Sequence, residues 1–175
     1  MTGGIVVRGL IAASVLSAAL AGAASAGPGQ KGHSHDTFAA GEPGNPKNAS
    51  RVIEVEMREG NGSMSYFPAI IQVTRGEQIR FVLKNVGELK HEFMLDTVEA
   101  NRKHAIAMQK NPEMEHADPN GHQIDPKKSG ELLWRFTKLG TYEFACLHPG
   151  HYEGGMKGVI VVAEQGKTTA KAQPK

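Results

Sequence analysis

Hydrophobic residues alternate with polar ones along several short segments of this chain, and this period of two restricts the fold more than any other feature. The alternation and the β-branched composition predict strands at 53–57, 69–74, 79–83, 91–96, 132–136, 141–146 and 158–162. Turn-forming sequences such as Gly60-Asn61-Gly62 and Lys138-Leu139-Gly140 separate them. About seven short strands, with no helix between most of them, predict an all-β fold, an antiparallel sandwich or barrel.

One segment departs from this period. Residues 97–110 have a helix-forming composition, with Thr97 as a candidate N-cap and Asn111-Pro112 as a stop signal. We therefore expect one helical insertion at 97–110, followed by a polar loop over 111–130. An insertion of this length in an all-β domain indicates a role of its own.

The two ends of the chain differ in composition from its middle. Residues 1–26 combine a single charge, Arg8, with an Ala-rich apolar run and the small-x-small sequence Ala24-Ser25-Ala26, which predicts a cleaved signal peptide. Residues 27–50 and 164–175 are rich in small and polar residues, and we expect a flexible leader and a flexible tail there. The folded domain is expected over 51–163. The mature protein is then exported to the periplasm, with no membrane span, since the apolar run is too short for one.

Charge excludes two classes of partner. Without the one Arg of the signal, the 20 basic residues fall to 19, against 18 acidic ones. Nucleic-acid and membrane-surface binding need clustered positive charge, so neither is expected.

The chain also has a single cysteine, Cys146, which is unusual for an exported domain because cysteines there usually form disulfide pairs. A metal-bound thiolate is one use for such a residue, and a small buried apolar residue is the other.

The spacing after this cysteine points to the first use. Cys146, His151 and Met156 follow one another at five-residue intervals in a loop that begins where a predicted strand ends. A thiolate, two imidazoles and a weak thioether are the ligand set of an electron-transfer copper site, whereas zinc sites usually contain more cysteines or no methionine. The second imidazole must come from elsewhere in the fold. His91, at the start of a predicted strand, is the best candidate; its alternative is a surface histidine at a strand end.

With these residues in place, the chain over 51–163 resembles the cupredoxins, and within them it is similar to the periplasmic copper-tolerance cupredoxins. The segments that carry the resemblance are Phe67-Pro68, Arg75-Gly76-Glu77-Gln78-Ile79, His91-Glu92-Phe93, the loop from Cys146 to Met156, the leader sequence Asp36 to Gly44, Met57-Arg58-Glu59-Gly60 and Met114-Glu115-His116. The resemblance implies a Greek-key β-barrel or sandwich, one type 1 copper held by His91, Cys146, His151 and Met156, and a part in surviving excess copper. His148 departs from the family pattern, which has an apolar residue there, and it offers a rival imidazole.

Further soft donors lie in and after the helical insertion. His104 and Met108 share a helix face, and Met114 and His116 follow in the loop. A second, weaker copper site is one interpretation, because thioethers and imidazoles suit Cu(I). The other, which we favour, is a solvated helix with Met108 packed inward. His33 and His35 in the leader have the same two readings, loose copper capture or an unstructured tail.

Three functions fit such a protein. The first is copper handling: binding, buffering or Cu(I)/Cu(II) cycling during copper stress. The second is a mobile electron carrier that meets a redox partner, such as a cytochrome or a copper enzyme, through the edge of His151. The third, an oxidase or reductase, fits poorly, because the neighbours of the cysteine are Ala145 and Leu147 rather than histidines, and a binuclear copper centre would need a second cysteine. We therefore expect a protein that is not an enzyme.

Overall fold

The computed structural model describes Met1 and residues 38–111 and 118–166. Its elements lie in one compact unit, Lys31–Lys175. The predicted signal peptide, the first part of the predicted leader and most of the predicted tail lie outside the described residues. Among the residues that are described, no helix has the length and apolar character needed to cross a membrane.

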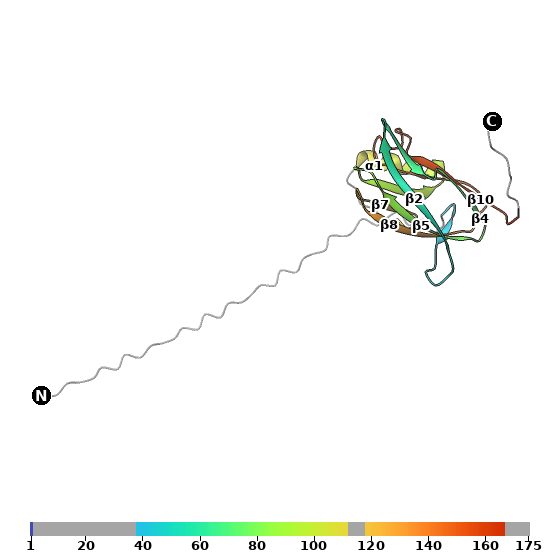
Figure 1. Cartoon of the computed structure of the whole chain (residues 1–175), viewed down its shortest axis with the longest axis horizontal. Coiled ribbons are helices and arrows are strands. Elements are labelled where there is room, and N and C mark those ends of the chain that lie inside the picture. Colours follow the sequence, from blue (N-terminus) through green and yellow to red (C-terminus); the bar gives the residue numbers. More distant parts are fainter. Residues whose placement is uncertain (2–37, 112–117, 167–175) are drawn as a thin grey trace. The chain divides into compact units, whose positions relative to one another are not determined.

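In the part of the chain that the structure describes, strands dominate and one helix interrupts them (Figure 1). In chain order the elements are β1 (Gly41–Pro43), β2 (Arg51–Gly60), β3 (Ser63–Phe67), β4 (Ile70–Thr74), β5 (Gln78–Asn85), β6 (His91–Asp96), α1 (Val98–Lys110), β7 (Gly121–Ile124), β8 (Ser129–Phe136), β9 (Gly140–Ala145) and β10 (Lys157–Ala163).

The strands form two five-stranded sheets, with the orders β1-β8-β5-β2-β3 and β4-β10-β9-β6-β7. We expected purely antiparallel sheets, but both sheets are mixed: β2 pairs with β5 in parallel, and β4 pairs with β10 in parallel. Parallel neighbours cannot be joined by a tight hairpin and need a crossover. Between β2 and β5 the chain makes this crossover through β4, which belongs to the other sheet.

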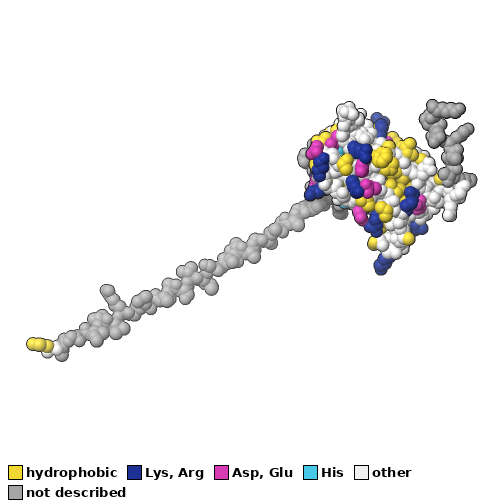
Figure 2. Space-filling model, viewed as in Figure 1, with side chains coloured by type: hydrophobic (Ala, Val, Ile, Leu, Met, Phe, Trp, Pro, Cys, Tyr) yellow, Lys and Arg dark blue, Asp and Glu magenta, His cyan; other side chains and the backbone are white. Residues whose placement is uncertain are grey.

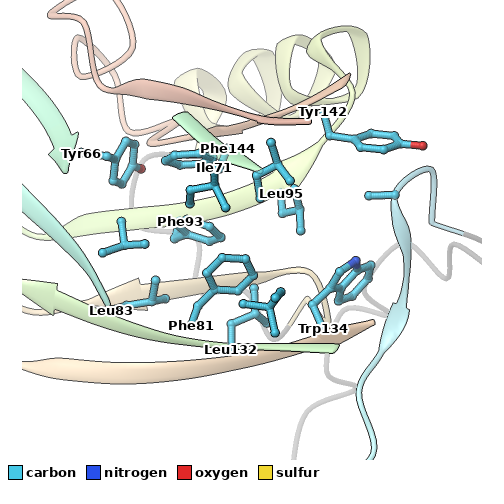
Figure 3. Close-up of a cluster of buried hydrophobic side chains, with 14 of the residues drawn as sticks. Tyr66, Ile71, Phe81, Leu83, Phe93, Leu95, Leu132, Trp134, Tyr142 and Phe144 are labelled. Carbon is cyan, nitrogen blue, oxygen red and sulfur yellow. The ribbon is translucent and has the colours of Figure 1, made fainter. Parts of the chain in front are cut away.

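The core lies between the two sheets. Alternate residues of β5 and β8, among them Phe81 and Trp134, point into it from the first sheet, and Phe144 and other residues enter from the second (Figure 3). Phe93 lies between the layers: its ring stacks on Phe144 at 4.9 Å between centroids and lies 5.3 Å from Phe81. The period of two read from the sequence is therefore the inward and outward alternation of a half-buried sheet.

Charged side chains on the outer face of the first sheet pair across neighbouring strands. Lys84 and Glu54 lie 2.6 Å apart, and so do Arg80 and Glu131. Figure 2 shows basic and acidic side chains interspersed on the face in view. This distribution agrees with a net charge of +2 for the chain, and it covers the polar side of the alternation with ion pairs that water can reach.

Helix α1 covers part of the outer face of the second sheet. It begins at the predicted cap, where the Thr97 side chain accepts a hydrogen bond from the backbone N–H of Ala100 at 3.1 Å. From the helix, Met108 packs with Met94, Ala145 and Leu147 in a small second cluster of buried residues. Because the helix covers this face, β6 is buried on both sides: all its residues except Asp96 are buried, and Phe93-Met94-Leu95 at its centre are consecutive hydrophobic residues rather than an alternation.

Three strands lie where the sequence predicted none. β1 falls within the expected flexible leader: Ala40 is buried, Gly41 pairs with Phe136, and Phe38 packs edge-on against Trp134 at 5.2 Å. β7 falls within the expected polar loop and pairs with β6. β3 forms a hairpin with β2 around the Gly60-Asn61-Gly62 turn. The physical reason is shared: each is five residues or shorter, too short to display a clear alternation, and each lies at an edge of its sheet.

Candidate metal centre

The side chain of Cys146, the residue directly after β9, points into the core. Tyr142, Phe144 and Cys146 all belong to the main hydrophobic core, whereas Ala145 and Leu147 belong to the cluster beneath α1. The alternation predicted from the sequence therefore holds to the last residue before the loop. The sulfur is fully buried and forms no disulfide.

The loop after Cys146 turns back on itself through a series of backbone hydrogen bonds. The N–H of His151 donates to the carbonyl of His148, the N–H of Met156 donates to that of His151, and the N–H of Cys146 donates to that of Met156, each at 3.0 Å. Gly150 and Gly155 take positive φ values of 86° and 100°, a conformation that residues with a Cβ rarely adopt. These turns bring the loop's three candidate ligand residues to one end of the sandwich.

His91 joins them from the first position of β6. The pairing of β6 with β9 sets its position, since Met94 lies opposite Ala145. Its Nδ1 atom lies 4.0 Å from the Cys146 sulfur and 3.2 Å from the Nδ1 atom of His151, which is itself 3.3 Å from the sulfur. One donor atom from each of these three residues lies within 4.8 Å of the others. Three residues singled out from the sequence thus converge, and both imidazoles face the sulfur with Nδ1.

Met156 closes the same loop and is fully buried in the main core. Its backbone is hydrogen-bonded to both Cys146 and His151, so the loop holds it beside them. All four predicted ligand residues are therefore at this end of the sandwich. Their exposure differs: Cys146, His91 and Met156 are buried, while His151 is partly exposed.

Burial controls the protonation of these groups. It raises the pKa of the Cys146 thiol to about 12, although the backbone N–H groups of Glu92 and His148 donate to the sulfur and oppose the rise. Burial lowers the pKa of His151 to about 4, helped by repulsion from His91 and His148. Burial also lowers the pKa of His91, although the hydrogen bond to Glu59 and its negative charge act in the opposite direction. The histidines are therefore neutral and ready to donate a lone pair, whereas the thiol must lose a proton before it can bind a metal.

Glu92, next to His91 in the chain, donates a backbone hydrogen bond to the Cys146 sulfur. Its backbone N–H lies 3.3 Å from the Cys146 sulfur, and its carbonyl accepts a hydrogen bond from the buried Tyr66 hydroxyl. Its own carboxylate accepts the N–H of Leu147 at 3.3 Å. This role was not predictable from sequence, because it depends on contacts between residues 54 and 55 positions apart in the chain.

Glu59 is a second residue that the sequence reasoning missed as part of the site. One of its carboxylate oxygens lies 2.5 Å from Nε2 of His91, on the side of the ring away from the sulfur. Burial would raise the pKa of Glu59, but hydrogen bonds from the backbone N–H groups of Glu88 and Leu89, together with His91, outweigh it and lower the pKa. The group is an ionised carboxylate near neutral pH.

The remaining histidine of the loop, His148, and two residues of the second candidate site, His104 and Met108, are not part of this cluster. The His148 ring is partly buried, with its centroid 5.6 Å from that of His151. His104 lies 3.8 Å from the Glu92 carboxylate, and Met108 is fully buried beneath α1. Met114 and His116 lie outside the described residues, as do His33 and His35. The second copper site therefore stays a prediction.

The chemistry of the convergent donors fits copper. A soft thiolate with two imidazoles suits both Cu(I) and Cu(II), and a buried methionine beside them supplies the weak thioether of such sites. The sulfur accepts backbone hydrogen bonds, and both imidazoles are neutral, so each histidine can donate a nitrogen lone pair without losing a proton.

Comparison with known proteins agrees with this geometry. The chain is 45% identical over 131 residues to the copper-resistant cuproprotein CopI of Rubrivivax gelatinosus, which covers 74% of this chain and 78% of that protein. It is 37% identical over 153 residues to the protein of the same name from Pseudomonas aeruginosa, covering 71% of this chain and 82% of that one.

Solved structures show the same fold. Auracyanin B matches with a TM-score of 0.59 at 21% identity, covering 71% of this chain and 96% of its own. The auracyanin of Roseiflexus castenholzii matches with a TM-score of 0.55 at 27% identity, covering 66% and 99%. The architecture is the Greek-key β-sandwich of the cupredoxins, as predicted. Residues 53–163 also match the family described as copper-binding proteins of the plastocyanin/azurin type. The sequence, the fold and the donor set agree, and the chain belongs to the plastocyanin/azurin family of copper-binding proteins.

Proposed function

We propose that this protein holds one type 1 copper through Nδ1 of His91, the sulfur of Cys146, Nδ1 of His151 and the thioether of Met156. The observation that carries the proposal is the convergence of three donor atoms within 4.8 Å of one another, in a buried site whose cysteine has no disulfide partner. The position of Met156 in the same hydrogen-bonded loop supports its assignment as the fourth, weaker ligand.

The protein's residues hold and shield the metal, and bound copper supplies a centre that changes oxidation state by one electron. The two sheets and the loop keep the donors fixed, because backbone hydrogen bonds tie the loop and β6 is anchored between β7 and β9. His91, Cys146 and Met156 are themselves fully buried, so water is excluded from the inner side of the site. Cycling between Cu(I) and Cu(II) at this centre is part of the proposal.

We further infer that the protein is exported to the periplasm and contributes to copper tolerance by binding, buffering or cycling copper there. The support comes from two sources. The relatives of 45% and 37% identity are named copper-resistant cuproproteins, and the first 26 residues have the composition of a signal peptide. The protein is a binding protein rather than an enzyme in this proposal, since its one cysteine is flanked by Ala145 and Leu147.

A mobile electron carrier is the second candidate, and the exposure of His151 favours it. His91 is fully buried, so His151 is the imidazole that reaches the surface. A redox partner such as a cytochrome or a copper enzyme would then exchange electrons at this edge.

Copper titration of the mature protein tests the metal site. We expect one equivalent of copper to give an intense visible absorption and a paramagnetic resonance signal. The Cys146→Ser variant should lose the absorption, whereas the His122→Ala variant, which removes an exposed imidazole from β7, should keep it. Unchanged colour in Cys146→Ser would overturn the ligand assignment.

Growth of a deletion strain separates the two physiological roles. A copper-sensitive deletion strain whose tolerance is restored by the wild-type gene, but not by the Cys146→Ser gene, would support copper handling. Normal copper tolerance together with a respiratory defect would favour the electron carrier and overturn the copper-tolerance proposal.

A further inference from the structure

The carboxylate of Glu59, near the end of β2, contacts three hydrogen-bonding partners, two backbone N–H groups and the ring of His91. Its Oε1 atom lies 2.5 Å from Nε2 of His91 and accepts the N–H of Leu89 at 3.0 Å. Its Oε2 atom accepts the N–H of Glu88 at 2.8 Å. The Glu59 side chain is 19% exposed and that of His91 is fully buried, so the interaction is largely withdrawn from water.

The loop between β5 and β6 is shaped to fit this carboxylate. A Cβ atom at Gly87 would lie 2.2–2.4 Å from the three carboxylate atoms of Glu59, so a residue with a side chain cannot occupy that position as it stands. Asn85 braces the same loop: its side chain accepts the N–H of Gly87 at 2.9 Å and donates to the carbonyl of Leu89 at 2.7 Å. The loop therefore holds the carboxylate firmly, and the carboxylate holds His91.

This contact decides which nitrogen of His91 is free. A neutral imidazole carries one N–H, and an ionised carboxylate can only accept a hydrogen bond. The proton must then be on Nε2, where Glu59 accepts it, and the lone pair must be on Nδ1. Nδ1 is the atom that faces Cys146 and His151. Glu59 cannot ligate the same ion, because it contacts the opposite side of the ring.

We propose that Glu59 is a positioning residue of the metal centre, which fixes the Nε2–H tautomer and the ring orientation of His91 before the metal binds. The inference rests on the proposed assignment of His91 as a ligand. Carboxylates that accept the second N–H of a ligand histidine orient the ring and make it a stronger donor, and their removal typically costs 10- to 100-fold in metal affinity.

The residue type follows from the geometry. An alanine would leave the His91 N–H and two backbone N–H groups without their acceptor. A glutamine could still accept from His91 through its carbonyl oxygen, but its NH₂ group would then face the N–H of Glu88, donor against donor. We therefore expect a graded series, in which Glu59→Ala has the larger effect and Glu59→Gln the smaller one.

Long-range ¹H–¹⁵N NMR of the metal-free protein reads the tautomer of His91 directly. We expect Nε2–H in the wild type, Nε2–H in Glu59→Gln, and a mixture of tautomers in Glu59→Ala. Competition titration with Cu(I) should show an affinity about 10- to 100-fold lower in Glu59→Ala. The matched control is Glu54→Gln, which removes the same charge from the same strand roughly 17 Å away and should change neither measurement.

The outcomes separate this inference from the copper proposal. An Nδ1–H tautomer in the wild type, or unchanged tautomer and affinity in Glu59→Ala, would overturn the positioning role and leave the copper site intact. A wild type that shows Nε2–H but binds no copper would overturn the proposed function instead. If Glu59→Ala fails to fold, as thermal unfolding would show, the wild-type tautomer and the Cu(I) affinity of Glu59→Gln decide the matter: an Nδ1–H tautomer in the wild type, or an unchanged affinity in Glu59→Gln, would overturn the positioning role.

Discussion

The buried thiol of Cys146 gives copper affinity a pH dependence that can be worked out from its surroundings. Burial raises the pKa of this thiol from 9.0 to about 12. Because a metal binds the thiolate, binding releases the thiol proton, and protons compete with copper at every pH below the thiol's pKa. Rising pH removes this competition, so affinity rises. Proton binding by the histidines adds little to this competition above pH 7, since the pKa values of His91 and His151 are both lowered.

The size of the effect distinguishes a buried thiol from an ordinary one. With a pKa near 12, affinity should rise about tenfold, or ~1.4 kcal/mol, for each pH unit, and so about 1000-fold between pH 7 and pH 10. With the ordinary pKa of 9.0, the thiol would be mostly ionised by pH 10. The rise over the same range would then be about 90-fold and would flatten above pH 9.

Anaerobic competition between the metal-free protein and a chromophoric Cu(I) chelator measures this dependence, once the chelator's own protonation is subtracted. The logarithm of affinity should rise in a straight line with unit slope from pH 7 to pH 10. The Cys146→Ala variant should bind weakly and without this slope. A curve that levels off above pH 9 would refute the argument that burial raises the pKa of the thiol. An affinity that does not change with pH would show that the Cys146 thiolate is not a ligand.

Three further substitutions test other parts of the structure. Met156→Leu nearly conserves volume and should leave a copper site that keeps its visible absorption but shifts in band position and reduction potential, because the thiolate and imidazoles remain; loss of all copper would contradict a weak-ligand role. Phe93→Ala removes a fully buried ring between the sheets and should lower the free energy of unfolding of the metal-free protein by about 3–5 kcal/mol in chemical denaturation. Thr97→Ala removes the cap of α1 and should cost about 1 kcal/mol by the same assay while the copper spectrum stays unchanged; a spectral change would connect the helix to the metal.

Much of the fold was predictable because burial on one side of a sheet leaves a direct trace in the sequence. The alternation around Phe81, Trp134 and Phe144 predicted three central strands, and the Thr97 cap predicted the start of α1. Edge strands leave a weaker trace. β1 and β7 are four residues or fewer, which is too short for an alternation of hydrophobic and polar residues to be recognised. The parallel pairings also escaped prediction, because they depend on the path of the chain between the sheets.

The candidate site shows the same division between local and distant information. The spacing of Cys146, His151 and Met156 is local, so the sequence displays it. His91 needed the additional inference that its segment is a strand reaching the same end of the sandwich. Glu59 could not be inferred in this way, since its contact with His91 spans 32 residues and depends on the turn at Gly87.

The distance along the chain between the two halves of the site has a consequence for the order of events in biogenesis. His91 and Cys146 are 55 residues apart and meet only when β6 pairs with β9. In an unfolded chain, Cys146, His151 and Met156 are still near one another in one loop, but His91 is not held beside them. Folding must precede the assembly of a complete site, so a polypeptide that crosses a membrane unfolded would travel empty and acquire its metal only after arrival.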